Sequence, residues 1–256
     1  MARALRAAGC VFAEEESWLL ISSAHTPAEL AAMVDRRTSG VPLEHVVGWA
    51  EFCGIRIEVD PGVFVPRRRS ELLVCEAVSL ADSTAVIVDL CCGSGAVGAA
   101  IAISVDEPEL HAADIDAASV RCARRNLARI GGQVHEGDLY EALPTALLGR
   151  VDLLVANAPY VPTEELGLLP AEARLHEPHA ALDGGEDGLD IQRRIIAEAS
   201  RWLAADGHLL VETSERQATH TADEMLGDGL VARVATSEDL EATVVVGTPA
   251  TASRSG

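Results

Sequence analysis

Short apolar runs alternate with amphipathic segments through most of the chain, and this alternation predicts an α/β fold. The expected strands are short runs rich in Val, Ile, Leu and Ala, at 85–90, 109–114, 133–136, 151–157, 207–213, 229–235 and 241–247. Helical patterns lie at 71–81, 95–104, 117–130, 190–204 and near 216–226. Strands that alternate with helices pair in parallel, and two final strands joined by a short link form an antiparallel edge. We therefore predict a seven-stranded, mostly parallel sheet with helices on both faces and an antiparallel C-terminal edge.

The front of the chain has a different pattern, with two short helices expected at 13–24 and 27–37. The second opens with Thr26-Pro27-Ala28-Glu29, which combines a capping box with Pro at the first helical position. Apolar residues on these helices are expected to pack on each other and on the main domain. A β-hairpin is expected at 49–59, and Ser70 is expected to cap the helix that follows it.

These patterns divide the chain into four parts. The expected division is a short helical segment, a β-hairpin linker, a main α/β domain and a disordered tail, at 1–42, 43–69, 70–248 and 249–256. The apolar run at the N-terminus is short and acidic residues follow it at once, so it does not fit a signal peptide. No stretch approaches the roughly 20 apolar residues that a membrane helix needs, so no membrane association is expected.

The strand at 151–157 ends in a pattern that indicates a ligand site. The residues are Val-Asp-Leu-Leu-Val-Ala-Asn-Ala-Pro-Tyr at 151–160, and Pro159 ends the sheet pairing because it has no N–H to donate. In open α/β sheets the ligand crevice lies beyond the carboxyl ends of the strands. Asn157 and Tyr160 are therefore candidates for substrate contact.

A glycine-containing turn follows the first strand of the main domain. Gly93 and Gly95 allow backbone conformations and a close ligand approach that a Cβ would hinder, and they precede a helix whose free N–H groups attract electronegative groups. Asp114 is the last residue of the next expected strand, where a carboxylate can accept hydrogen bonds from both ribose hydroxyls. Cys91 occupies the position of the first glycine of the usual turn.

The net charge and the cysteine content of the chain limit the partners and ligands that are expected. The chain has 40 acidic and 20 basic residues and a net charge of −20, so its surface repels phosphate backbones and a nucleic-acid partner is not expected. Its one basic cluster, Arg67 to Arg69, is expected to be a solvated turn, with a clamp for an acidic segment as the alternative. The six cysteines lack the spacing of a zinc site, which indicates free thiols, a reducing cytoplasm and no metal.

Four motifs in order resemble those of class I S-adenosylmethionine-dependent methyltransferases. They are Asp-Leu-Cys-Cys-Gly-Ser-Gly (89–95), Ala-Asp-Ile-Asp (113–116), Glu-Gly-Asp-Leu (136–139) and Asn-Ala-Pro-Tyr (157–160). The stretches at 46–67 and 177–190 narrow the resemblance to the protein-(glutamine-N5) methyltransferases, which modify peptide release factors and a ribosomal protein. The resemblance covers roughly 43–247. It implies a Rossmann-like fold, S-adenosylmethionine as cofactor, and a protein partner with an exposed glutamine.

The resemblance also implies the site residues. The cofactor set is Asp89, Cys91, Gly93, Gly95, Asp114, Ile115, Asp138, Leu139 and Asn157. The catalytic set is Asn157, Pro159 and Tyr160, and the substrate set is Phe64, Arg67, Asn157, Ala158, Pro159 and Tyr160. Three departures stand out: Ala158 replaces a proline, Cys91 replaces a glycine, and 68–71 read Arg-Arg-Ser-Glu where the family has Pro-Glu-Thr-Glu.

An amide nitrogen needs orientation before it can react, because its lone pair is delocalised into the carbonyl. Hydrogen-bond acceptors on its two N–H groups supply that orientation, and the Asn157 side-chain oxygen and the carbonyl of residue 158 are the expected pair. The carbonyl survives the change from Pro to Ala, although Ala158 leaves the loop less restricted. Two alternatives stay open: a small-molecule N-methyltransferase, and a cofactor-binding protein with little turnover. They are motivated by Ala158, by Cys91 and by the short helical segment, since family members carry a larger helical domain there.

Overall fold

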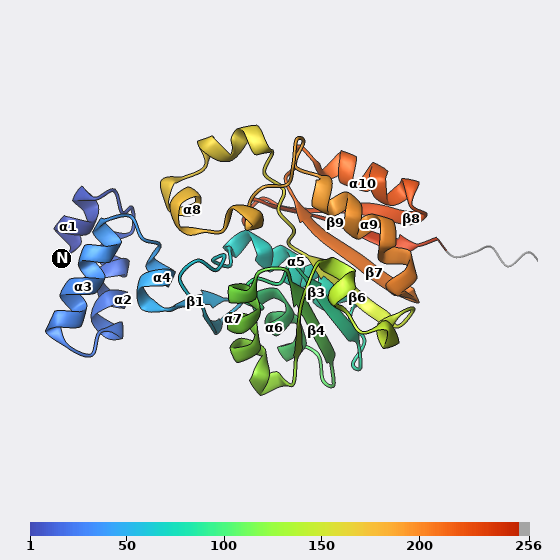
Figure 1. Ribbon diagram of the computed structural model, residues 1–256, viewed down its shortest axis with the longest axis horizontal. Coiled ribbons are helices and arrows are strands. Elements are labelled where there is room, and N and C mark those ends of the chain that lie inside the picture. The colour runs from blue at the N-terminus through green and yellow to red at the C-terminus, as the bar shows by residue number, and fades with distance from the viewer. Residues whose placement is uncertain (251–256) are drawn as a thin grey trace, which may run out of the picture.

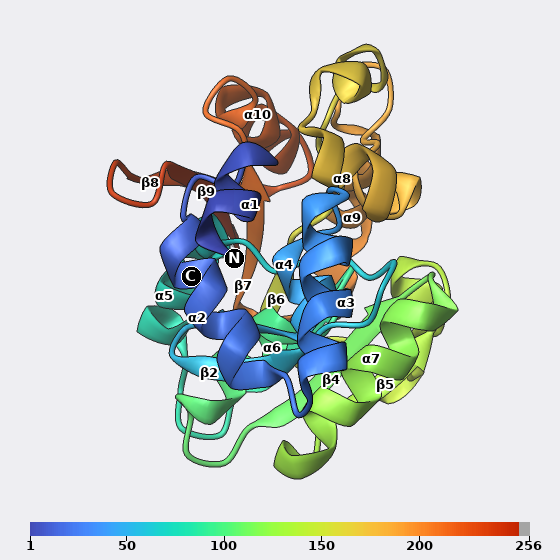
Figure 2. The ribbon, with the colours of Figure 1, turned by 90° about the vertical axis from the view of Figure 1, so that its left-hand side faces the viewer.

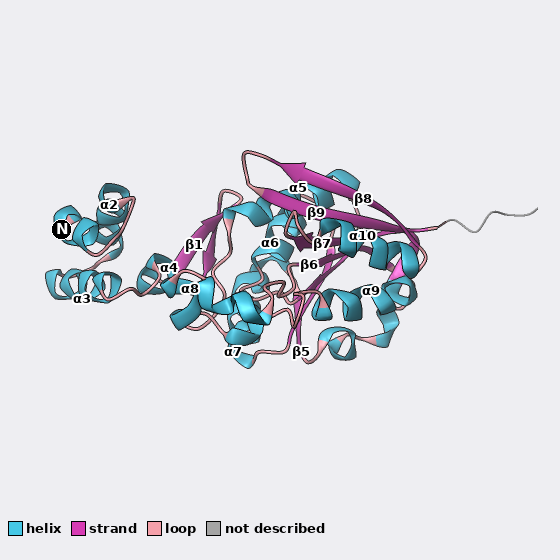
Figure 3. Ribbon diagram, turned by 90° about the horizontal axis from the view of Figure 1, so that it is seen from above, coloured by secondary structure: helices cyan, strands magenta, loops and turns pink. Residues whose placement is uncertain are grey.

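The computed structural model describes residues 1–250, and a seven-stranded sheet forms its centre (Figures 1 and 3). The strands run in the order β5-β4-β3-β6-β7-β9-β8. Their bounds are β3 Val86–Leu90, β4 Glu109–Asp114, β5 Gln133–Glu136, β6 Val151–Ala156, β7 Leu203–Thr213, β8 Leu230–Ser237 and β9 Ala242–Pro249. The first five strands in this order, from β5 through to β7, pair in parallel. Strand β9 pairs antiparallel with both β7 and β8. The predicted mostly parallel sheet with an antiparallel C-terminal edge is confirmed.

Strand β3 lies at the point where the chain order reverses, because β4 pairs with one of its edges and β6 with the other. The chain therefore leaves β3 in one direction and later returns to its other side. In open α/β sheets such a switch point leaves a crevice beyond the carboxyl ends of the two diverging strands. The glycine turn follows β3 and the Asn-Ala-Pro-Tyr segment follows β6, so the topology brings both to this crevice.

Helices cover both faces of the sheet, and side chains of β3 alternate between them. Ile87 joins the cluster that contains residues of the hairpin and of α5 to α7, whereas Val86 and Val88 join the cluster formed with α9 and α10. The helices of the main domain are α5 Glu71–Leu80, α6 Ala96–Ile103, α7 Ala117–Leu127, α8 Ala171–His176, α9 Asp190–Trp202 and α10 Ala218–Gly227. Short 3₁₀ turns lie at η1 Arg68–Ser70, η2 Ala128–Ile130, η3 Leu139–Ala142, η4 Thr145–Leu147, η5 Thr163–Leu168 and η6 His179–Ala181.

The four helices at the front of the chain form a separate layer beside the main domain (Figures 1 and 2). The β-hairpin lies between these helices and the sheet (Figure 1). Their bounds, with those of the hairpin, are α1 Ala2–Ala7, α2 Ala13–Ser23, α3 Pro27–Thr38, α4 Leu43–Val47, β1 Trp49–Phe52 and β2 Ile55–Glu58. They have a small core of their own that includes Leu5, Leu20 and Met33. Trp18 departs from the expected packing, since it is 74% exposed.

Local predictions differ from the structure at several places. The capping oxygen of Thr26 accepts the Glu29 N–H at 3.1 Å, as predicted. The prediction that Ser70 caps α5 was wrong, because its side chain makes no capping hydrogen bond and faces another partner. Helices α1, α4 and α8 were not predicted, since each is only five or six residues long.

The described part of the chain ends just after the last strand of the sheet. Strand β9 ends at Pro249 and Ala250 donates its N–H to Gly229, so the rest of the expected tail, 251–256, lies outside the described residues. Within residues 1–250, none of the helices combines the length and the apolarity that crossing a bilayer requires.

Candidate active site

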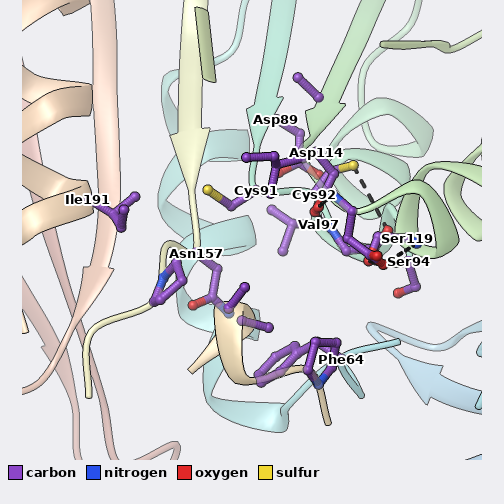
Figure 4. A pocket seen from close by; sticks show the side chains of 18 of the residues that line it. Phe64, Asp89, Cys91, Cys92, Ser94, Val97, Asp114, Ser119, Asn157 and Ile191 are labelled. Atoms are coloured by element: carbon purple, nitrogen blue, oxygen red, sulfur yellow. Dashed lines mark hydrogen bonds between the residues drawn. The ribbon is translucent and has the colours of Figure 1, made fainter. Parts of the chain in front are cut away.

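A cavity of about 540 Å³ opens at the carboxyl ends of β3, β4 and β6 (Figure 4). Phe64, Pro66 and Ser70 line it on one side, and the turn after β3 lines another. Residues 178–181, which follow α8, contribute a further part of the wall. The cavity therefore joins the switch point of the sheet to segments that lie far apart in the sequence.

The turn after β3 presents its backbone to the cavity. Gly93 has a φ of 54°, and a Cβ added there would meet nothing closer than the Phe64 Cβ at 3.9 Å, so the turn faces open space. Gly95 has a φ of 79° at the start of α6 and packs against Leu127. It lies outside the cavity wall, and its conformation shapes the turn. Cys91 lines the cavity with a φ of 56°, the same left-handed region as the two glycines.

Asp89 is buried at the end of β3 beneath this turn. Its Oδ2 accepts the Gly98 N–H at 2.9 Å, which links the strand to the first turn of α6. Burial raises the pKa of Asp89 to about 7, and the nearby Asp114 carboxylate contributes in the same direction. The side chain thus braces the turn and reaches the cavity wall at the same time.

Asp114 and Asp138 bring carboxylates to the far side of the cavity. Asp114 accepts the N–H groups of Gly93 at 2.8 Å and of Asp116 at 2.9 Å, which ties the end of β4 to the glycine turn. Desolvation raises the pKa of Asp114 despite these bonds. Asp138 pairs with Arg194 of α9 at 2.7 Å.

Two apolar residues accompany these carboxylates in the wall. Ile115, which follows Asp114, lines the cavity and is 64% exposed. Leu139, which follows Asp138, has a φ of 47° and also lines the cavity. Together they offer apolar surface beside two carboxylates, which suits the base and ribose of a nucleoside.

Asn157 and Pro159 line the cavity from the end of β6, on the side opposite the cofactor motifs (Figure 4). The Asn157 Nδ2 donates to the Ser70 Oγ at 3.1 Å. Ala158 between them is buried, and Tyr160 stands behind the wall with its hydroxyl donating to Glu212 Oε1 at 3.3 Å. Burial raises the pKa of Tyr160 far above its usual value, so the phenol stays protonated.

Phe64 and Arg67 occupy different positions relative to the cavity. Phe64 lines it, whereas Arg67 lies outside the wall with its guanidinium 5.1 Å from the Phe64 ring centre. Arg67 also pairs with the buried Glu177 at 2.5 Å, and the Val65 N–H donates to the same carboxylate at 3.3 Å. The loop before α5 is therefore tied to the segment that follows α8.

Several residues at or beside the site were not identified from the sequence. They are Ser70, Glu177, Arg194 and Glu212, and each acts through a partner at least 50 residues away. Glu177 is buried, although it begins a polar, glycine-rich stretch of the sequence. In the described part of the chain, no group of three or more His, Cys, Asp or Glu side chains is arranged to hold a metal ion.

Comparison with known proteins supports the resemblance. Residues 54–185 match the family model of the methyltransferase small domain. A release factor glutamine methyltransferase of Geobacter sulfurreducens is 40% identical over 197 residues, which cover 75% of this chain and 68% of the relative. A 4-amino-L-phenylalanine/4-methylamino-L-phenylalanine methyltransferase of Streptomyces pristinaespiralis is 36% identical over 193 residues, which cover 72% of this chain and 65% of the relative.

The fold is also found in solved structures. A methyltransferase from Pyrococcus furiosus aligns with a TM-score of 0.57 at 15% identity, over 76% of this chain and 88% of that one. At this identity the likeness concerns the fold alone. The family model, the identity to curated relatives and the cavity at the switch point agree, and the chain belongs to the family of the glutamine methyltransferases with a methyltransferase small domain.

Proposed function

We propose that this protein transfers a methyl group from S-adenosylmethionine to the side-chain amide nitrogen of a glutamine in a protein of the translation machinery. Membership of the family supports the reaction class, and the relative from Geobacter sulfurreducens is named for a release factor substrate. The observation that carries the proposal is the position of Asn157. Its side chain lines the cavity opposite the cofactor motifs, where an acceptor amide would lie.

The residues of the cavity fit the cofactor. Its volume of about 540 Å³ falls within the roughly 300–1,000 Å³ of typical small-molecule sites. Asp114 would hold the ribose hydroxyls, Ile115 and Leu139 would flank the base, and the open backbone at Gly93 would lie against the methionine part. When bound, S-adenosylmethionine supplies an electrophilic methyl group.

Asn157 has a defined orientation that suits an amide substrate. Its NH₂ group donates to Ser70, which leaves the carbonyl oxygen Oδ1 as the group available to a substrate. An acceptor in this place would bond one N–H of the incoming glutamine and turn the nitrogen lone pair toward the donor. The carbonyl of residue 158 would accept the second N–H, as expected from the sequence. Such orientation contributes several kcal/mol to the barrier reduction, about 7–11 in well-oriented model systems.

The proposal is tested with labelled methyl donor and a lysate of the host. We expect label to enter a protein band, and peptide mass spectrometry to place it on a glutamine. Replacement of Asn157 by Ala should lower the labelling rate by roughly 100-fold or more, since loss of one positioned hydrogen-bonding group in an active site has effects of that size. Calorimetry with S-adenosylmethionine separates a loss of catalysis from a loss of cofactor binding in this variant, since the resemblance also places Asn157 in the cofactor set. An N157A protein with the full labelling rate would contradict the proposal.

A second candidate function is methylation of a small amine. The relative from Streptomyces pristinaespiralis is named for a small aromatic amine substrate, although it has nearly the same identity to this chain as the release factor enzyme. The same assay separates the two functions. Label found only in the low-mass fraction would favour the small molecule, and retained cofactor binding without any labelled product would favour a protein with little turnover.

A further inference from the structure

We propose that Gly188 and Gln217 are positioning residues that hold the backbone of the Asn-Ala-Pro-Tyr segment, 157–160, in the conformation that orients an acceptor amide. This inference rests on the proposed function, because it assigns a role to residues behind the place where that amide would bind. Neither residue lines the cavity. Both therefore act through the segment and touch no substrate.

The segment is anchored by backbone hydrogen bonds at both of its ends. Before it, Ala156 of β6 pairs with β3 on one side and with β7 on the other. After it, the Val161 N–H donates to the Leu182 carbonyl at 3.1 Å, and the Val161 carbonyl accepts the Gly184 N–H at 2.9 Å. Only the four residues 157–160 lie between these anchors. The position of the second anchor therefore determines the path of the segment.

Gln217 bonds the end of the segment to two other parts of the chain. Its side chain is buried, and its Nε2 donates to the Tyr160 carbonyl at 3.0 Å and to the Asp187 carbonyl at 2.9 Å. Its Oε1 accepts the hydroxyl of Ser214, which follows β7. Because carbonyl groups only accept hydrogen bonds, the NH₂ group has to face both of them, and both of its protons are used. One amide thus joins the segment, the glycine-rich stretch 184–188 and the end of β7.

The glycine-rich stretch packs directly against the carbonyl groups of the segment. A Cβ added at Gly188 would lie 2.3 Å from the Tyr160 oxygen and 2.4 Å from the Gln217 Nε2. A Cβ added at Gly184 would lie 2.7 Å from the Pro159 oxygen. These distances are far inside van der Waals contact, so this close approach requires glycine at both positions. The stretch that follows the cavity wall therefore supports the backbone of 159–160 from behind.

This support matters because the expected second acceptor for the amide is a backbone carbonyl. The carbonyl of residue 158 is aimed only by the path of the chain, since its peptide group is planar and no side-chain rotation turns it. Ala158 does not restrict its own φ as a proline would, so contacts outside the segment have to supply the restraint. A displacement of about 1 Å at a reacting group can lower a rate roughly 100-fold. Gly188 and Gln217 are placed to prevent such a displacement.

The experiment compares the labelling rates of three variants in the lysate assay with saturating S-adenosylmethionine. Gly188→Ala pushes the Tyr160 carbonyl away, and Gln217→Met keeps an unbranched side chain but removes both donated bonds. Each should lower the rate roughly 10- to 100-fold. Gly229→Ala is the matched control, because Gly229 has a φ of 81° against 79° at Gly188, while a Cβ added there meets no atom within 4 Å. It has the same backbone strain without the contact, and its rate should stay within about twofold of the wild type.

Amide hydrogen exchange without any acceptor gives a second measurement that does not depend on activity. Exchange in peptides that cover 157–163 should be faster in Gly188→Ala and Gln217→Met than in the wild type and in Gly229→Ala, with little change elsewhere. The Gln217 variant decides the question if Gly188→Ala does not fold.

Several results would overturn the positioning role. They are equal rates in Gly188→Ala and Gly229→Ala, unchanged exchange in 157–163, and faster exchange throughout the protein, which would mark a general loss of stability. A loss of rate that more S-adenosylmethionine restores would mark a role in cofactor binding and would overturn it too. A wild-type protein that labels no glutamine would instead refute the proposed function, and the exchange measurement would still decide whether these two residues hold the segment.

Discussion

Cys91 has a backbone conformation that residues other than glycine rarely adopt. Its φ of 56° matches that of Gly93 in the same turn, so the turn keeps its shape although a side chain replaces the usual glycine. Burial raises the pKa of the Cys91 thiol, and the nearby Asp114 and Asp89 carboxylates act in the same direction. The thiol is therefore protonated and a poor nucleophile. Its effect on the cavity is steric.

Replacing Cys91 by Gly and by Ala separates the effect of backbone strain on stability from the effect of the thiol group. A left-handed conformation costs a residue with a Cβ about 1–2 kcal/mol, whereas glycine loses about 0.5–1 kcal/mol through its more flexible unfolded chain. We expect C91G to exceed C91A in free energy of unfolding by about 0.5–1 kcal/mol, measured by urea denaturation. C91G should also bind S-adenosylmethionine at least as tightly as the wild type, because it enlarges the cavity. Equal stability of the two variants would show that the conformation carries no strain.

Asp89 gives the stability a defined dependence on pH. Its pKa is about 7 in the folded protein and about 3.9 in an unfolded chain, so the folded state holds a proton that the unfolded state loses between about pH 4 and 7. Stability should fall as the pH rises through this window, by up to about 1.4 kcal/mol per pH unit, and level off above it. Asp89→Asn can still accept the Gly98 N–H, so its advantage over the wild type should grow from pH 4 to 7. A difference in unfolding free energy that stays constant with pH would contradict this assignment.

At the scale of the elements, the sequence predicts those strands and turns whose structure is determined by residues close together in the chain. Buried parallel strands are apolar on both faces, so β3 and β6 are recognisable from composition alone. The glycine turn and the strand ends carry the residues that converge on the cavity, and the reversal of strand order at β3 brings them together. The fold and most of the cavity wall were therefore predictable.

Contacts between distant elements were not predictable in the same way. Ser70 before a helix has the pattern of an N-cap, yet its hydroxyl bonds Asn157, which is 87 positions away in the chain. Glu177 follows α8 in a polar segment, and only the fold shows that Arg67 reaches it across 110 positions. Ala158, which stands where the family has a proline, is buried in the core cluster that contains residues of β6. A single sequence holds no record of such pairs, because their spacing follows no period.

At the scale of the whole molecule, one side chain joins the front helices to the wall of the cavity. Arg37 of α3 is 8% exposed and bonds Glu16 of α2 at 2.6 Å and 3.1 Å. Its other arm bonds Glu172 of α8 at 2.6 Å. Because the residues after α8 line the cavity, the front helices are connected to the site through this arginine.

Variants of Arg37 and of Glu172 should have different effects, one on the stability of the whole protein and the other on the local order of α8. Arg37→Ala leaves the buried Glu16 without its partner and should lower the free energy of unfolding by about 3–5 kcal/mol. Glu172 is half exposed, so Glu172→Gln should cost less than about 1 kcal/mol but speed amide exchange in residues 171–181, measured by mass spectrometry. Glu14→Gln, which removes the exposed partner of Arg6, is the matched control and should change neither. Unchanged exchange in E172Q would show that α8 is held by its other contacts.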